Sequence, residues 1–512
     1  MARNEQSVSI SGFRGLNQRK LLGRNPEQTT NLENVIVRDG IIRGRKGITT
    51  FDNIGTASVT PTIIGLFPFY RSKTEVASLL RVTSSRVELW NDSGNAWDNI
   101  TGPTIANDTT KFPQATTLDD TLFFTTGSIV RVRKYSGSGD TSLAGGTPPY
   151  CKAIEGYVGF LFLGNISSDG ITFSPLDIQY SDDPDVDWTL CDGNTLTLDE
   201  SPGDIRVLKV HDRLLLAGKS DAIIAIRWTG GQTRFVQEKI FGKGVIAPLS
   251  WQQCGEIGHI FLGSDLNLYI TNGVQTKPLP FNVQKALQET MSITKAPICV
   301  AAVDEDKTTY HLFYSTSASD TWLAGELAYN YQTGEFYKNS YTVPKVIRAT
   351  AYKQSNTVKN KILFSGDDDL VYEAELGTDD NGNKISRIYD TDYLNYGIEG
   401  DKWLTRVRLS FIGLKRDCHV RVSCSKDFEA DLPNEADSLE YPRTYDLRND
   451  GEVIYEIPSP LYGNWFNVRV EMFHLGSTNV CELREIVPYF VPMTRTSMET
   501  SKVEAPTTGQ GV

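Results

Sequence analysis

The sequence has few of the residues from which catalytic and metal sites are usually built. It contains five histidines, no two of them at metal-ligand spacing, and seven cysteines without any C-x-x-C pair. Neither a zinc site nor a disulfide framework is indicated by these counts. No glycine-rich phosphate loop follows a convincing strand. We therefore expect no cofactor, no metal and no catalytic residues, and predict that the chain is not an enzyme.

Long apolar runs are absent as well. The longest, residues 157–163, is much shorter than the ~20 residues that a helix needs to cross a bilayer. The first residues, MARNEQSVSI, lack the charged start and continuous apolar core of a secretory signal. We expect no membrane-spanning segment and synthesis in the cytoplasm.

Helical periodicity is also scarce. The 512 residues are 39% hydrophobic and 22% charged, which is a globular composition, and 43 glycines punctuate short runs of alternating polarity. This pattern predicts an all-β fold. The one helix that we expect spans residues 282–291, with Asn282 as its N-cap and Val283, Ala286, Leu287 and Met291 on one face.

A weak repeat runs from about residue 58 to residue 378, inside a predicted domain of residues 58–400. Its hydrophobic runs, marked by Leu122, Leu161, Leu215, Phe261, Leu312 and Leu363, recur at steps of 39, 54, 46, 51 and 51 residues. Blades of a β-propeller take about 40–50 residues for four antiparallel strands. With a further blade starting near residue 61, the repeat predicts a six- or seven-bladed β-propeller.

Longer alternating strands follow in residues 401–495. Runs at residues 407–412, 419–423, 452–457 and 465–472 alternate apolar with charged side chains, as expected of sheets with one buried face. We predict a C-terminal β-sandwich there. The remaining residues, 496–512, are polar and lack aromatics, and we expect a flexible tail. Residues 1–57 are predicted to be an extended N-terminal arm with a hairpin.

The charge is unevenly distributed. The net charge is −12, yet residues 1–50 hold nine basic and four acidic side chains, so the rest of the chain has an excess of seventeen acidic ones. An acidic body repels phosphate, which argues against sequence-specific duplex binding. The basic arm is either a solvated segment or a docking arm that lies on an acidic partner or on its own neighbour.

We expect two groups of polar residues, three histidines and two acidic clusters, to have structural rather than functional roles. His211, His259 and His311 recur in or beside the hydrophobic strands of the repeat, which favours a structural role over a ligand or base. Acidic clusters at residues 366–369 and 377–383 do not match a calcium loop, because no Glu stands at the twelfth position. We interpret both clusters as solvated turns.

The N-terminal segment contains a recognisable series of short motifs. It reads SGFRGLN (residues 11–17), RNP (24–26), TNLENVIVRDG (30–40) and IRGRKG (42–47). This resembles the start of structural proteins of tailed bacteriophages. With the predicted propeller and sandwich, the chain is similar to the tail nozzle proteins of short-tailed phages, of the tail tubular protein B or packaged-DNA stabilisation type.

That resemblance implies a structural virion protein, made in the host cytoplasm and found in the tail. It implies a ring-forming subunit, hexameric in the family, that lines the DNA ejection channel. The expected partners are other copies of the chain, the tail adaptor, other tail proteins and, transiently and without specificity, genomic DNA. The alternative is a carbohydrate-binding or carbohydrate-degrading propeller of a phage tail, which exposed aromatic side chains would support, and the chain has 8 Trp and 22 Tyr. Residues 181–188 resemble a degenerate Asp-box of sialidase-type propellers, but in that family the box is a structural hairpin distant from catalysis and does not imply an enzyme.

The resemblance also marks candidate partner-binding residues in the arm. Asparagines can bond backbone groups where no sheet ladder exists, leucines can pack on a surface, and arginines offer charge to an acidic subunit or to phosphate. The alternative, compatible with the first, is that residues 35–37 and 41–43 form a hairpin around Asp39-Gly40 that closes the propeller ring. The candidate assembly residues are Phe13, Leu16, Asn17, Arg24, Asn31, Leu32, Asn34, Arg43 and Arg45.

Overall fold

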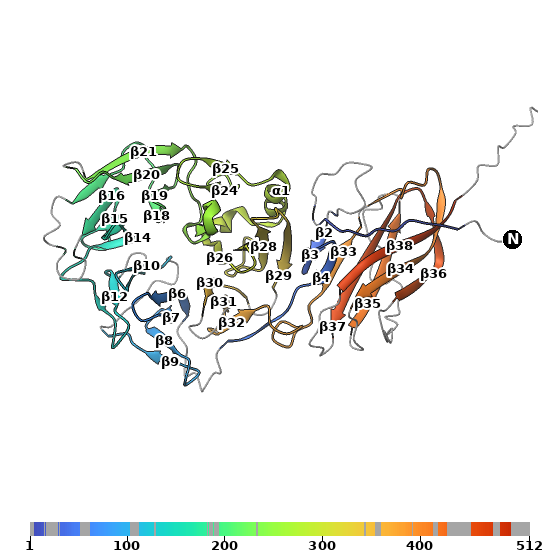
Figure 1. Cartoon of the computed structure of the whole chain (residues 1–512), viewed down its shortest axis with the longest axis horizontal. Coiled ribbons are helices and arrows are strands. Elements are labelled where there is room, and N and C mark those ends of the chain that lie inside the picture. The colour runs from blue at the N-terminus through green and yellow to red at the C-terminus, as the bar shows by residue number, and fades with distance from the viewer. Residues whose placement is uncertain are drawn as a thin grey trace, which may run out of the picture.

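The protein, seen in a computed structural model, is mostly β, with a ring of small sheets beside a sandwich of two longer ones (Figure 1). This confirms the predicted fold class. The structure describes residues 5–14, 16, 29, 31–51, 62–102, 112–126, 130–181, 183, 188, 194–231, 234–341, 345–353, 360–391, 393–412, 418–426, 452–474 and 482–492.

The ring is a β-propeller of antiparallel units. Within the described residues, six units are separate four-stranded sheets, and one more belongs to an eight-stranded sheet. The separate sheets are β6 (Ile63–Arg71), β7 (Val76–Thr83), β8 (Val87–Asn91) and β9 (Ala96–Asn99); β10 (Gln114–Leu118), β11 (Thr121–Thr125), β12 (Arg133–Tyr135) and β13 (Ser142–Leu143); β14 (Tyr150–Tyr157), β15 (Phe160–Ser167), β16 (Ser174–Ser181) and β17 (Thr195–Thr197); β18 (Ile205–His211), β19 (Leu214–Lys219), β20 (Ile223–Trp228) and β21 (Phe235–Phe241); β22 (Gln252–Gln253), β23 (His259–Leu262), β24 (Leu268–Thr271) and β25 (Thr276–Pro278); and β30 (Arg348–Tyr352), β31 (Lys361–Ser365) and β32 (Val371–Ala374) with β5 (Ile48–Thr50).

The remaining unit consists of β26 (Val300–Asp304), β27 (Thr309–Tyr314), β28 (Gly325–Asn330) and β29 (Phe336–Ser340). First strands of neighbouring units pack around the axis, for example β14 against β18 and β30 against both β26 and β6. The six points that marked the sequence repeat all lie on second strands, from β11 to β31. The repeat therefore identified the same strand of successive units.

A strand from the N-terminal segment completes the last unit. β5 pairs antiparallel with β32, with Thr49 opposite Glu373. The ring thus closes by joining residues 48–50 to residues 371–374, and Ile48 is fully buried in the cluster between the last two units. Closure by β5 corrects the expectation that the hairpin of residues 35–43 closes the ring.

That hairpin exists, but it belongs to the sandwich. β3 (Val35–Arg38) and β4 (Ile41–Gly44) pair around Asp39 and Gly40, which both adopt positive φ (54° and 72°), as a tight hairpin turn requires. β4 continues the sheet by pairing with β38 (Glu482–Pro492). The sheet order is β3-β4-β38-β34-β36, with β34 (Lys402–Ile412), β36 (Glu452–Gly463) and, beside β38, β1 (Gln6–Ser7).

The other sheet of the sandwich is continuous with the propeller. Its order is β26-β27-β28-β29-β2-β33-β37-β35, in which β2 (Asn31–Glu33) joins a propeller unit to β33 (Arg387–Asp390), β37 (Phe466–His474) and β35 (Cys418–Lys426). β33 lies inside the range predicted as propeller, and β1, β3 and β4 inside the predicted arm, yet all four strands pair within the sandwich sheets. The two structural units are therefore not continuous segments of the sequence, because strands from the predicted arm and propeller ranges belong to the sandwich.

Helices are few. The predicted helix is α1 (Phe281–Thr290), and it buries Val283, Ala286 and Leu287 as expected. Its N-cap is Pro280 rather than Asn282, and no side chain caps it. Among the described residues no helix has the length and hydropathy to span a membrane. Short 3-10 turns are η2 (Pro248–Ser250), η3 (Gly255–Ile257) and η4 (Ile293–Ile298).

Candidate functional site

The N-terminal segment, residues 31–50, lies between the propeller and the sandwich, and we call it the junction segment (Figure 1). Its first strand, β2, pairs antiparallel with β33, Leu32 lying opposite Tyr389, and parallel with β29 through Glu33 and Lys338. One short strand therefore forms backbone hydrogen bonds with both the propeller and the sandwich, which we call the two lobes.

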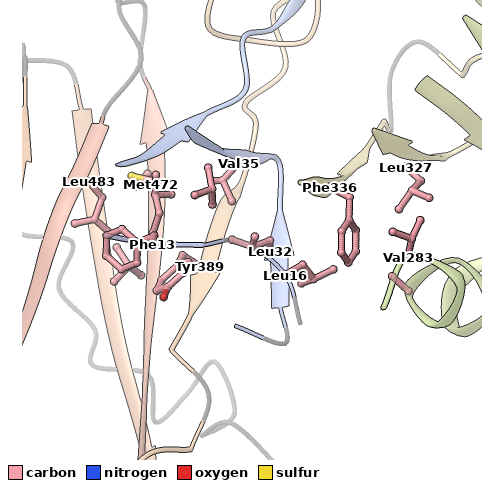
Figure 2. Close-up of a cluster of buried hydrophobic side chains, with 14 of the residues drawn as sticks. Phe13, Leu16, Leu32, Val35, Val283, Leu327, Phe336, Tyr389, Met472 and Leu483 are labelled. Atoms are coloured by element: carbon pink, nitrogen blue, oxygen red, sulfur yellow. The ribbon is translucent and has the colours of Figure 1, made fainter. Parts of the chain in front are cut away.

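Apolar side chains of the N-terminal residues fill the space between the two lobes. Figure 2 shows Phe13 and Tyr389 on the sandwich side, Leu32 and Leu16 in the middle, and Phe336 and Val283 on the propeller side. Leu32 is fully buried, and the ring of Phe13 meets that of Tyr389 edge to face at 5.1 Å. Each such side chain contributes about 1.5–3 kcal/mol by burial. The hydrophobic core is thus continuous across the junction.

Asn34 follows β2 and connects four parts of the chain. It is buried with φ of 56°, a conformation that asparagine tolerates better than most residues. Its Nδ2 donates to Ser340 Oγ (3.1 Å) and to the carbonyl of Ser386 (2.8 Å). Its Oδ1 accepts from the backbone of Ser340 (2.9 Å) and from Arg45 Nε (2.8 Å). The amide is fully used, so another side chain here would leave several of these groups unpaired.

Arg45 forms a buried ion pair with Asp380. Its Nη1 and Nη2 donate to the two carboxylate oxygens at 2.7 and 2.5 Å, and both side chains are about 95% buried. Burial alone would lower the pKa of Arg45, but the hydrogen bond and charge of Asp380 reverse this and raise it. The guanidinium also lies 4.6 Å from the ring centre of Tyr341. The fork geometry suits arginine rather than lysine.

Arg387 binds the backbone on both sides of this ion pair, at Arg45 and near Asp380. Its Nε and Nη2 donate to the carbonyl of Arg45 at 3.0 and 2.9 Å, and Nη2 also donates to the carbonyl of Thr378. Burial lowers the pKa of this completely buried guanidinium to about 10. Gly47 completes the contact, because an added Cβ would lie 1.8 Å from the carbonyl oxygen of Asp379. Only glycine fits there.

The junction also borders a cavity of about 1100 Å³ lined by the hairpin β3–β4 and by the propeller unit β26–β29. Its wall holds a buried polar cluster. Glu326 accepts hydrogen bonds from Asn339 Nδ2 (2.7 Å) and the hydroxyl of Tyr341 (2.6 Å), and it contacts Nδ1 of His311. The structural role expected for His311 thus includes a carboxylate partner on the wall of a cavity, which the sequence did not indicate.

The candidate assembly residues have different fates. Phe13, Leu16, Leu32, Asn34 and Arg45 are buried against the chain itself and leave almost no surface for another subunit. Arg43 is partly exposed and pairs with Glu482 at 3.2 Å, and Asn31 Nδ2 donates to Asp390 (2.6 Å). Asn17 and Arg24 lie outside the described residues. Contact with another subunit through any of these side chains stays a prediction.

Other polar residues behave in part as expected. His259 is buried with Nε2 on the carbonyl of Val210, and burial lowers its pKa to about 3. The cluster at residues 377–383 is not a purely solvated turn, because Asp380 is buried against Arg45. Nothing in the sequence pairs these two residues. Most of the Asp-box at residues 181–188 lies outside the described residues. In the part that the structure describes, no three potential metal ligands come together.

Comparisons with known proteins identify no family for this chain. No family model and no curated protein matches the chain. Among solved structures, the Pan2 WD40 domain of Neurospora crassa has a TM-score of 0.38 at 10% identity, covering 65% of this chain and 95% of its own. BBS1N in complex with ARL6DN gives 0.40 at 9%, covering 65% and 98%. Similarity at this level carries no argument about function.

Proposed function

We propose that the protein is a structural subunit of a phage tail, ring-forming and belonging to the nozzle through which the genome leaves. Other copies of the chain, the tail adaptor and other tail proteins are its partners in this proposal, and the virion tail is its location. The single observation that carries the proposal is the fit between the N-terminal motifs and the junction.

Conspicuous residues of these motifs have defined structural tasks. Leu32 fills the core between the lobes, Asn34 joins the strands with its amide, and Arg45 pairs with Asp380. Asp39 starts the hairpin turn, and Gly47 permits the approach of residue 379. At these positions the backbone or the core favours the residue type that the motif contains. This supports the resemblance on which the proposal rests.

The rigid connection between the propeller and the sandwich also suits a subunit that has to resist mechanical force. A continuous sheet and a continuous core run from the propeller unit β26–β29 into the sandwich. Two domains connected only by a linker would move relative to each other by default. The net charge of −12 fits a channel component that touches DNA without gripping it, since tight binding needs several phosphate contacts by cations.

Assembly of the purified protein tests this proposal. Light scattering after gel filtration and negative-stain microscopy are expected to show closed rings, alone or after addition of tail adaptor. Fluorescence anisotropy is expected to show weak, salt-sensitive binding to duplex DNA. A chain that stays monomeric at high concentration beside the other tail proteins would contradict the proposal.

One observation favours the carbohydrate alternative. Trp403 and Tyr462 pair at 4.9 Å on the sandwich surface, and both are more than a third exposed. Exposed aromatic pairs of this kind can stack on sugar rings. Incubation of the protein with capsular and lipopolysaccharide glycans, followed by assays of both cleavage and retention on the glycan, separates the alternatives, because a nozzle subunit is expected neither to cut the glycans nor to be retained on them.

A further inference from the structure

One face of the propeller unit β26–β29 is unusually polar for a blade. Blade faces normally pack apolar side chains against the next blade. Here the antiparallel register places His311 opposite Ala328, Ala328 opposite Tyr337, and Glu326 opposite Asn339, so these side chains share one face. His311, Tyr337 and Asn339 all line the 1100 Å³ cavity. This polar part of the face borders a hollow, whereas Phe313 and Tyr341 of the same unit pack against Phe364 of the next one.

Glu326 orients two of these side chains. Its carboxylate contacts Nδ1 of His311 and accepts from Nδ2 of Asn339. The ring of His311 and the amide of Asn339 each use one of their two polar atoms in this contact with Glu326. The other polar atoms, Nε2 of His311 and Oδ1 of Asn339, are buried and have no hydrogen-bond partner among the described residues. A buried polar atom without a partner costs about 1–3 kcal/mol. Both atoms have almost no accessible surface, so a ligand reaches them only after the two side chains rotate, and a ligand that then satisfied both atoms would recover that free energy.

Three cations of the cavity wall are neutralised within the protein. Arg45 pairs with Asp380, Arg43 with Glu482, and Lys307 with both Asp304 and Glu375. Because these three cations have anionic partners within the protein, they are not free to hold a phosphate group. Lys46, Asp306 and Glu335 also line the cavity and form no ion pair among the described residues, so the wall offers charges of both signs and does not select a ligand of one charge. An uncharged ligand is compatible with such a wall.

The chemistry of the unpartnered atoms narrows the ligand further. Asn339 Oδ1 requires a donor. Nε2 of His311 is an acceptor when the ring is neutral and a donor when it is protonated. A hydroxyl group can donate and accept, so it satisfies both atoms in either state of the ring. The phenol of Tyr337 also lines the cavity and adds a third group that can donate and accept.

We infer that this cavity is a binding site for an uncharged polyhydroxylated ligand, a mono- or disaccharide, held by His311, Asn339 and Tyr337. Glu326 positions the first two and does not contact the ligand. The volume of about 1100 Å³ is slightly above the range of about 300–1,000 Å³ typical of small-molecule sites, so a mono- or disaccharide fits with room to spare. The inference concerns binding alone and is independent of the proposed tail function.

The test is a titration of the full-length protein with a defined panel. Neutral probes are methyl α-D-glucopyranoside, galactose, rhamnose, N-acetylglucosamine, lactose and sucrose; glucosamine and glucuronic acid are the charged counterparts. Saturation-transfer NMR followed by calorimetry is expected to show binding of at least one neutral sugar, with weaker binding of charged analogues.

Conservative variants locate the binding. Tyr337→Phe keeps the ring and removes only the hydroxyl, and it is expected to raise the dissociation constant about 2–10-fold, the effect of one neutral hydrogen bond. His311→Gln is expected to weaken binding similarly. Tyr150→Phe, at a half-buried tyrosine of β14 in another propeller unit, is the matched control and is expected to bind like the wild type. Melting curves of all variants verify folding.

Three results would overturn the inference. The first is that no neutral sugar of the panel binds at millimolar concentration. The second is that Trp403→Ala abolishes binding while Tyr337→Phe leaves it intact, which would place the sugar on the sandwich surface. The third is that charged analogues bind more tightly than neutral ones.

Discussion

Arg45 and Asp380 are 335 positions apart in the chain, yet the guanidinium of the first donates to both carboxylate oxygens of the second in the interior of the junction. Asp380 belongs to the loop that follows the last propeller unit, and Arg45 belongs to the segment that returns to close this unit through β5. The ion pair therefore joins the start of the propeller to its end.

Replacing Arg45 by methionine is expected to lower the free energy of unfolding by about 3–5 kcal/mol, because Asp380 would stay buried without a counter-charge. The double variant Arg45→Met/Asp380→Leu is expected to recover part of this loss. Urea unfolding followed by fluorescence measures both. Arg38→Met is the control, since Arg38 pairs loosely with Asp39 on the surface, and its effect is expected to stay within about 0.5 kcal/mol. If Arg45→Met and Arg38→Met lowered the free energy of unfolding equally, the buried ion pair of Arg45 and Asp380 would be contradicted.

Gly47→Ala is expected to destabilise the protein by at least about 2 kcal/mol, because its Cβ would collide with the backbone at Asp379, which cannot rotate away as a side chain could. Gly242→Ala provides the comparison, as nothing lies within 4 Å of a Cβ added there. Thermal unfolding of the two variants gives the difference. If both melt alike, the close approach at Gly47 is absent in solution.

Leu32→Ala is expected to cost about 2–5 kcal/mol, because it opens a cavity in the fully buried core between the lobes. Leu143→Ala, at a residue that is 37% exposed, is expected to have little effect. Chemical unfolding measures the stabilities, and a small loss for the first variant would mean that the lobes do not share a core.

Acid sensitivity is expected to depend on Glu326. Burial opposes its ionisation, but the charge of His311 and the hydrogen bonds of His311, Tyr341 and Asn339 outweigh burial and lower the pKa of Glu326 from 4.5. A carboxyl whose pKa is lower in the folded state stabilises the protein above its unfolded pKa, and this stabilisation is lost as the pH falls through the folded value.

Glu326→Gln removes this titration. The variant is expected to be less stable than the wild type near neutral pH, and its free energy of unfolding is expected to fall less between about pH 7 and pH 3. Urea unfolding at several pH values measures the slope. Parallel pH profiles for the two proteins would show that the carboxylate is not stabilised by its neighbours.

The unpredicted parts of the junction have a common cause. The hairpin of residues 35–44 was predictable, because Asp39-Gly40 between alternating strands is a local signal. Its position beside β38 was not, because strand pairing across more than 400 residues leaves no local pattern. The same holds for Asp380, which local sequence presents as part of an acidic turn.

The sequence by itself determined the elements: short strands from alternating polarity, turns from Asn, Asp and Gly, and blade spacing from the repeat. These depend on contacts between residues near each other along the chain. Only the tertiary structure decided that β2 and β5, both from the N-terminal segment, pair in two different sheets. The same is true of the ion pair between Arg45 and Asp380 and of the position of His311 on the wall of a cavity. Such choices depend on which surfaces remain unpaired once the whole propeller and sandwich have formed, and that information is distributed over the entire chain.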